Sequence, residues 1–256
     1  MAPPLLAFYG ADIQDASIIY EGYNQCKLYR EILQPSGQGP WAHIIGPESN
    51  DPGQWSTGNG WAAAGMARVL KTIQVSGVGS WEGQEAEWWA SAEADLLEWI
   101  TQILDAVIES DLDGGLVRNY LDDDGSVSAE HTFGEISGSA VFASVIYRLA
   151  PSLGASYVRW ADGIRNVLNG VSASTGEWIV SQQGAASPAI DPLAWGGGIV
   201  EVSPEGQTFV VLMYSAWRDC VLSSVCDRSG GLIGGGTATA KRGIPHGRGG
   251  RRVGHQ

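Results

Sequence analysis

Hydrophobic positions along the chain recur mostly three or four residues apart, the spacing of one face of an α-helix. This pattern predicts helices over residues 15–33, 60–74, 83–109, 135–150, 156–169 and about 205–222. Strand-like alternation is scarce, and the acidic stretch 111–126 is expected to be a loop with at most a short strand. The pattern therefore predicts an all-α fold.

Glycine and proline mark the expected ends of these helices. Gly58-Asn59-Gly60 is interpreted as a turn that leads into the helix 60–74, and Gly77 is expected to end that helix. Pro151 is expected to stop the helix 135–150, and Asn169-Gly170 to cap the helix 156–169. The helices are thus predicted to form antiparallel pairs joined by polar loops.

Small residues are concentrated in two of these helices, where they allow neighbouring helices to approach closely. They are Ala62, Ala63, Ala64, Gly65 and Ala67 in one, and Gly138, Ala140 and Ala143 in the other. A closed ring of helical hairpins has this pattern because each hairpin buries one apolar face against its neighbours. An irregular all-α domain is the alternative, and periodicity does not separate the two.

Composition narrows the possible partners. The 256 residues carry a formal net charge of -13, so nucleic acid and anionic membranes are not expected to bind. No stretch is apolar for long enough to cross a bilayer. Eleven tryptophans accompany only four phenylalanines. These indole rings either fill the core or line a carbohydrate cleft, since flat apolar rings match the C–H faces of sugars.

Residues 1–228 are predicted to form the helical domain, and residues 229–256 a disordered Gly- and Arg-rich tail. Cys26 is expected in the core, whereas Cys220 and Cys226 could pair, although nothing in the sequence requires it. The first residues have no basic region and no long apolar core, so they are not expected to form a signal peptide. The sequence does not indicate the cellular compartment.

The sequence Trp55-Ser-Thr-Gly-Asn-Gly-Trp61 is the most informative motif. It resembles the Trp-x-Arg-Gly-Asn/Gln-x-Trp signature of the six-hairpin glycosidases, the unsaturated rhamnogalacturonyl and unsaturated glucuronyl hydrolases. Residues 17–33 and 132–150 resemble two further segments of that family, in the same order, and fungal-type members look closer still than bacterial ones. The resemblance covers roughly residues 1–220. It implies an (α/α)6 barrel that is incomplete at its N-terminus.

The resemblance also implies an activity. Family members hydrolyse oligosaccharides of pectin or rhamnogalacturonan type that end in an unsaturated uronic acid. An aspartate protonates the vinyl-ether double bond and activates water, and the resulting hemiketal collapses. That aspartate belongs to a segment just before the one that residues 1–10 resemble, so the catalytic residue is unknown here, with Glu21 as a weak candidate. A truncated, catalytically inactive domain that binds sugar or a partner is the alternative.

Six residues are candidates for binding the oligosaccharide. Trp55 and Trp61 are expected to form walls for a pyranose ring, and the helix start at Asn59 to direct N–H groups toward sugar oxygens. Thr57 occupies the place of the bacterial arginine that grips a carboxylate, and Tyr23 lies in the segment 17–33. His43 is a candidate basic residue; an ordinary loop histidine is the alternative.

Other chemistry is not indicated. A calcium loop with Gly125 at its sixth position needs an acid first and a glutamate twelfth, but Tyr120 and His131 occupy these places. No zinc-protease motif, phosphate-binding glycine loop or nucleophile elbow is present. Neither a metal nor a cofactor is expected.

Overall fold

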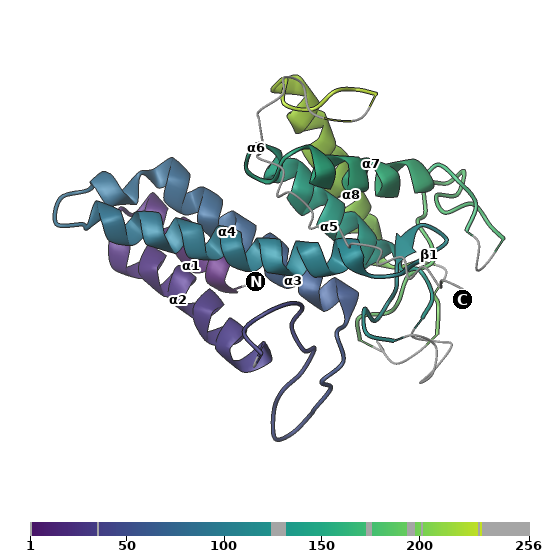
Figure 1. Cartoon of the computed structure of the whole chain (residues 1–256), viewed down its shortest axis with the longest axis horizontal. Coiled ribbons are helices and arrows are strands. Elements are labelled where there is room, and N and C mark those ends of the chain that lie inside the picture. Colours follow the sequence, from purple (N-terminus) through teal and green to yellow (C-terminus); the bar gives the residue numbers. More distant parts are fainter. Residues whose placement is uncertain are drawn as a thin grey trace, which may run out of the picture.

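The computed structural model describes residues 2–34, 36–123, 132–172, 176–193, 198–200, 202–229 and 231. This part of the chain is mostly helical (Figure 1). Its α-helices are α1 (Ala2–Asp12), α2 (Ala16–Leu33), α3 (Ser56–Ser76), α4 (Ala86–Glu109), α5 (Ile136–Arg148), α6 (Ala150–Leu153), α7 (Ala155–Val167) and α8 (Pro204–Leu222). A 3-10 helix, η1 (Val78–Ser80), joins α3 to α4. The two short strands β1 (Leu112–Asp113) and β2 (Leu116–Val117) pair antiparallel.

The helices form an arc of two layers. The helices α1, α3, α5 and α8 pack one against the next, and α2, α4 and α7 pack outside α1, α3 and α5 respectively. Figure 1 shows α1 to α4 at one side of the molecule and α5 to α8 at the other. The inner helices begin at one common end. Pro4 of α1 and Gly58 of α3 line one cavity there, Gly138 of α5 approaches Ser56 of α3, and Gly206 of α8 approaches Ser137.

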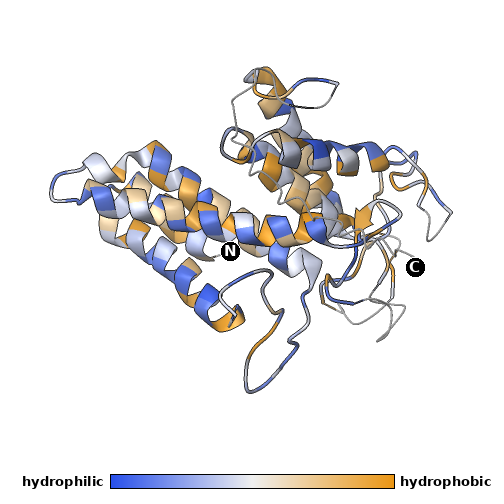
Figure 2. Cartoon of the chain, in the orientation of Figure 1, coloured by the Kyte–Doolittle hydropathy of each residue, from blue (hydrophilic) through white to orange (hydrophobic). Residues whose placement is uncertain are grey.

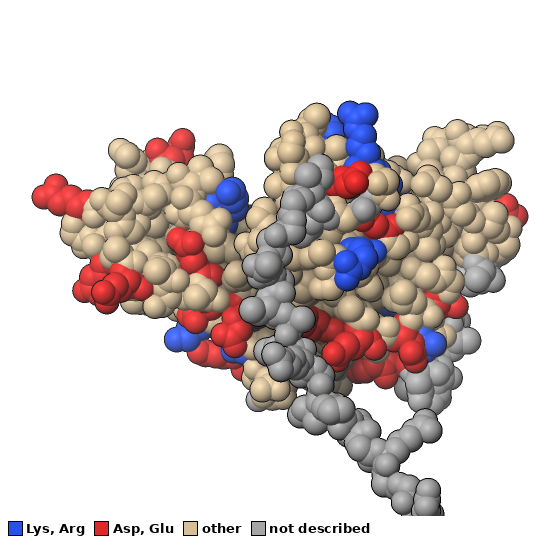
Figure 3. Space-filling view, turned by 45° about the horizontal axis from the view of Figure 1, so that its top comes forward, with Lys and Arg blue, Asp and Glu red and all other residues tan. Residues whose placement is uncertain are grey.

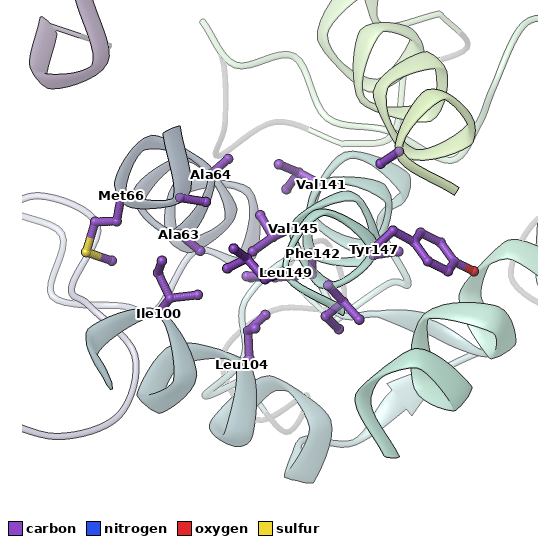
Figure 4. Close-up of a cluster of buried hydrophobic side chains, with 14 of the residues drawn as sticks. Ala63, Ala64, Met66, Ile100, Leu104, Val141, Phe142, Val145, Tyr147 and Leu149 are labelled. Atoms are coloured by element: carbon purple, nitrogen blue, oxygen red, sulfur yellow. The ribbon is translucent and has the colours of Figure 1, made fainter. Parts of the chain in front are cut away.

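The core centres on α5. Its residues 136–147 are all buried, and Figure 2 shows this helix as largely hydrophobic. In Figure 4, Val145 and Leu149 are directed toward α3, where Ala63 is too small to hold the helices apart. Leu104 of α4 belongs to the same buried cluster. The predicted role of the small residues in close helix packing therefore fits the observed core.

The predicted all-α fold is confirmed, but some predicted helix ends are wrong. Helix α3 begins at Ser56, so Gly58-Asn59-Gly60 lies within the helix and is not a turn. The glycine serves packing instead, since a Cβ on Gly60 would lie 2.0 Å from Cγ1 of Val141 in α5. Pro151 does not stop the helical region, because it occupies the first turn of α6, where its missing N–H costs no hydrogen bond.

Other boundaries agree closely with the sequence pattern. Gly77 ends α3 in the left-handed conformation, with φ of 63°. Helix α7 ends at Val167 with Leu168 as its cap, two residues before the predicted Asn169-Gly170 cap. The predicted disordered tail lies outside the described residues, apart from Ser229 and Gly231.

The remaining features of the fold are the state of the cysteines and the distribution of charge on the surface. Cys220 and Cys226 form a disulfide at the end of α8, and Cys26 is buried and unpaired. Figure 3 shows acidic side chains over the left end and the lower edge of the visible face, as the net charge of -13 leads one to expect. No described helix is long and apolar enough to cross a membrane.

Candidate active site at the start of the inner helices

A cavity of 280 Å³ lies between the first turns of α1 and α3. The second half of α2 and the loop between α2 and α3 complete its wall. Its lining is Ala2, Pro3, Pro4, Cys26, Tyr29, Leu33, Trp41, Ala42, His43, Gly58, Asn59, Trp61, Ala62, Gly65 and Met66. Three of the predicted sugar-binding residues, His43, Asn59 and Trp61, therefore share one cavity.

Asn59 fixes the floor of this cavity. Its side-chain oxygen accepts the backbone N–H of Trp41 at 2.7 Å, and its amide nitrogen donates to the Trp41 carbonyl at 2.9 Å. The same nitrogen donates to the Trp55 carbonyl at 3.1 Å. Since these bonds engage both ends of the amide, Asn59 holds the α2–α3 loop against the helix. Its neighbour Gly58 belongs to the first turn of α3, whose N–H groups have no acceptor within the helix.

His43 lies in a network with two partners. Its Nδ1 lies 2.9 Å from Oδ2 of Asp51, and the Tyr120 hydroxyl donates to the same oxygen at 2.6 Å. The Gly53 N–H donates to the other carboxylate oxygen at 3.0 Å. Burial acts to raise the pKa of Asp51, but the donors from Tyr120, His43 and Gly53 outweigh it and hold the pKa below its ordinary value. Asp51 is thus an ionised acceptor that positions the imidazole.

Trp55 supports this network from behind and does not line the cavity. Its side chain is 6% exposed, and its indole N–H donates to Oδ1 of Asn119 at 2.9 Å. Its ring and that of His43 have centroids 4.6 Å apart. The sequence predicted Trp55 as a wall for a sugar ring, but the structure places it against the imidazole, in a cluster with Tyr120 and Phe133.

Thr57 is also directed away from the cavity. It is fully buried where the first turns of α3, α5 and α8 meet, a region we call the helix junction (Ser56, Thr57, Glu135, Ser137, Gly138 and Gly206). Its hydroxyl donates to Oε2 of Glu135 at 3.0 Å, and the same oxygen accepts the Gly138 N–H at 2.7 Å. Burial raises the pKa of Glu135 despite these donors. Glu135 caps α5 and ties it to α3.

Trp61 connects the helix junction with the cavity. Its ring lines the cavity and meets Phe209 of α8 edge-on, with centroids 4.9 Å apart. Its indole N–H donates to Oε1 of Glu205 in the first turn of α8. Burial raises the pKa of Glu205, the Trp61 donor lowers it, and the nearby Glu135 raises it. Glu205 therefore orients the Trp61 ring.

Tyr23 and Glu21 lie elsewhere. Tyr23 is buried between α2 and α4, where its hydroxyl donates to Asp95 at 2.6 Å and its ring stacks on Trp99. Glu21 accepts hydrogen bonds from Asn24 and Gln25 of its own helix. Neither residue lines the cavity, so the structure brings neither to His43 or Trp61.

Sequence reasoning missed several residues of the site. Asp51 lies four residues before the motif Trp55–Trp61, and the backbone pairing between Ile44 and Asp51 brings it to His43. Tyr120 and Glu205 are 69 and 144 residues away in sequence from Asp51 and Trp61, their respective partners, so no local pattern links them. Among the described residues, no group of three His, Cys, Asp or Glu side chains could hold a metal ion.

The parallel inner helices, packed against outer helices, place the fold in the α/α-barrel class. No protein-family model matches the sequence, and no curated protein sequence matches it. Solved structures do match. A possible member of the GH105 family from Salmonella enterica serovar Paratyphi A is 18% identical, with a TM-score of 0.63 over 84% of this chain and 53% of its own.

Two further structures match at similar levels. The unsaturated glucuronyl hydrolase from a Bacillus species, described as responsible for the degradation of glycosaminoglycan, is 15% identical, with a TM-score of 0.60 over 85% of this chain and 57% of its own. A polysaccharide lyase is 14% identical, with a TM-score of 0.64 over 88% and 61%. The chain thus shares the six-hairpin α/α-barrel fold and spans 53–61% of the length of these structures.

Proposed function

We propose that this protein is a glycoside hydrolase-like protein that acts on oligosaccharides ending in an unsaturated uronic acid, of the pectin or rhamnogalacturonan type. One observation carries the proposal: the cavity at the start of the inner helices joins Trp61, Asn59 and His43. The solved structures with this fold include an unsaturated glucuronyl hydrolase, which supports the same substrate class. The fungal-type motif around Trp55 and Trp61 supports it as well.

In this proposal the sugar ring packs on Trp61. An aromatic face against a sugar ring contributes apolar contact. Glu205 and Phe209 hold the indole ring of Trp61 in one orientation. Gly58 lacks a side chain, so its backbone N–H in the first turn of α3 can approach a ligand oxygen. The Asn59 bonds to Trp41 keep the opposing loop in place.

A second candidate function is sugar binding without catalysis. It is favoured by the lining of the cavity, which contains no Asp or Glu among the described residues. Protonation of the vinyl ether needs a positioned acid, and in the family this is a carboxylic acid. The two candidates therefore share a ligand and differ in turnover.

Both candidates can be tested together. The protein is incubated with lyase-treated polygalacturonan, rhamnogalacturonan and glycosaminoglycan fragments, and the ultraviolet absorbance of the double bond and the released sugars are followed. Calorimetry with the same fragments measures binding. Loss of absorbance with sugar release supports the hydrolase, and binding without release supports the second candidate. Absence of both overturns the proposal.

Matched tryptophan variants locate the binding. Trp61→Ala should weaken binding of the fragments about tenfold, because an aromatic contact is worth about 1–1.5 kcal/mol. Trp178 is 59% exposed and does not line the cavity, so Trp178→Ala is the control and should leave the affinity unchanged. Equal affinities in the two variants would exclude this cavity as the sugar site.

A further inference from the structure

We propose that the protein has a second carbohydrate site, between the outer helices α2 and α4, and that this site takes a neutral oligosaccharide. A cavity of 400 Å³ lies there, between the start of α2 and the start of α4. We call it the outer cleft (Ser17, Tyr20, Gln84, Glu85 and Trp88). The inference goes beyond the proposed function, because it concerns another ligand at another place in the fold.

The outer cleft is distant from the cavity that contains Trp61. Helix α2 contributes to both, with Ser17 from its first turn in the outer cleft and Tyr29 from its later turns in the cavity. Tyr29 follows Ser17 by 12 residues, and an α-helix rises about 1.5 Å per residue, so the two positions are about 18 Å apart. Figure 1 shows the loop between α3 and α4, which borders the outer cleft, at the left end of the molecule.

Trp88 is the aromatic platform of the outer cleft. Its ring centroid lies 5.2 Å from that of Tyr20, 5.4 Å from that of Tyr23 and 4.8 Å from that of Trp89. Tyr23 and Trp89 are buried, whereas Tyr20 is 44% exposed and Trp88 is only partly buried. Rings held in this way offer a flat apolar surface to the C–H face of a sugar and lose little conformational freedom on binding.

Polar groups beside the platform are available to sugar hydroxyls. The Gln84 side-chain oxygen accepts the indole N–H of Trp89 at 3.2 Å, which orients the amide and leaves its Nε2 without a partner among the described residues. In the same part of the chain, the carboxylate of Glu85 and the hydroxyl of Tyr20 make no hydrogen bond either. A donor, an acceptor and a hydroxyl therefore surround the platform, as in a small-molecule site where a few polar groups fix the ligand.

The charges around the outer cleft favour a neutral ligand. Glu85 lines the outer cleft, and Asp15 and Glu82 line an adjoining cavity of 640 Å³ that shares Ser17 and Gln84 with it. Neither cavity has a described Lys, Arg or His in its lining. These carboxylates repel the carboxylate of a uronic acid but accept hydrogen bonds from the hydroxyls of a neutral sugar. The adjoining cavity lengthens the cleft, so that it suits an oligosaccharide.

Calorimetry with cellotetraose, β-1,4-galactotetraose and tetragalacturonate tests the inference. Wild-type protein should bind a neutral tetrasaccharide, and tetragalacturonate should not displace it. Trp88→Ala should weaken this binding about tenfold, and Tyr20→Ala should weaken it to a smaller extent, because each removes an aromatic contact. Trp61→Ala and Trp178→Ala are the matched controls and should leave the affinity for the neutral tetrasaccharide unchanged, since neither residue lines the outer cleft.

A spectroscopic measurement on wild type places the ligand without relying on the alanine variants. The indole N–H signal of Trp88, assigned with Trp88→Phe, should shift during titration with the neutral tetrasaccharide and saturate with it. The indole N–H signal of Trp61 should stay in place in the same titration.

Each outcome supports or overturns the inference. It is overturned if wild type binds neither neutral tetrasaccharide, if folded Trp88→Ala keeps the wild-type affinity, or if the binding is lost in Trp61→Ala instead. Displacement of the neutral sugar by tetragalacturonate would overturn the choice of ligand. If Trp88→Ala does not fold, the Trp88 signal of wild type decides, and a signal that stays in place overturns the inference. Failure of the proposed function leaves these results unchanged, so the two proposals can fail separately.

Discussion

The helix junction and the cavity lie at the same end of the helical arc, and both involve the first turn of α3. In the helix junction, side chains satisfy the helix starts directly: Glu135 accepts from Gly138 and Thr57 and is fully buried. In the cavity, the same turn faces a space lined by Gly58 and His43. A helix start that side chains cap serves stability, whereas one left uncovered beside aromatic rings can serve binding.

Gly60 gives the sharpest test of the junction side, and the largest expected effect. Gly60→Ala should destabilise the protein by about 3 kcal/mol, because its Cβ would lie 2.0 Å from Cγ1 of Val141 and force α3 and α5 apart. Urea unfolding measures the loss. A change below about 0.5 kcal/mol would show that the two helices are not in the described contact.

Replacing Glu135 tests how much its hydrogen bonds stabilise the helix junction. Glu135→Ala should cost about 2 kcal/mol, since it removes the cap of α5 and leaves the buried Thr57 hydroxyl without its acceptor. Urea unfolding of the variant beside Thr57→Val gives the matched comparison. If both variants were as stable as wild type, Glu135 would not tie α3 to α5.

The pH dependence of stability follows from the same residue. Burial raises the pKa of Glu135 above its ordinary value. A native state that holds the proton more tightly than the unfolded chain is most stable at pH below that ordinary value, and it loses this stability as pH rises through the native pKa. Between about pH 4 and about pH 7 the free energy of unfolding should therefore fall for wild type relative to Glu135→Gln. A rise would contradict the direction of the shift.

Replacing Tyr120 tests how much its hydrogen bond to Asp51 stabilises the loop beside the cavity. Tyr120→Phe should cost about 1.5 kcal/mol, because it removes a 2.6 Å hydrogen bond to the ionised Asp51 while it keeps the ring. Thermal unfolding measures the cost. Since Asp51 keeps the Gly53 N–H and His43, the fold should persist; an unfolded variant would mean that the loop depends on this one bond.

Gly65 gives the smallest expected effect, with the opposite sign to Gly60. It also lies in α3, but a Cβ there meets only Cγ of Pro4, at 3.9 Å. Gly65→Ala should therefore stabilise the protein by about 0.5–1 kcal/mol through helix propensity alone. Urea unfolding beside Gly60→Ala makes the comparison. Destabilisation would indicate that α1 lies closer to α3 than described.

The helices were largely predictable because their spacing of three and four depends on local sequence alone. The Gly58-Asn59-Gly60 stretch was wrongly interpreted as a turn, since nothing local shows that Gly60 is required by Val141 of another helix. The cavity was predictable only in part. Trp61, Asn59 and His43 belong to it. Trp55 and Thr57 lie outside it because their side chains bond to Asn119 and Glu135, which are far away in sequence.

The central claim is that a sugar binds against Trp61 and not against Trp55. The most direct measurement is the NMR spectrum of the indole N–H groups during titration with an unsaturated digalacturonate, with Trp61→Phe and Trp55→Phe to assign the two signals. The account predicts that the Trp61 signal shifts with saturation while the Trp55 signal stays in place. A Trp61 signal that does not move while the sugar binds would contradict the account.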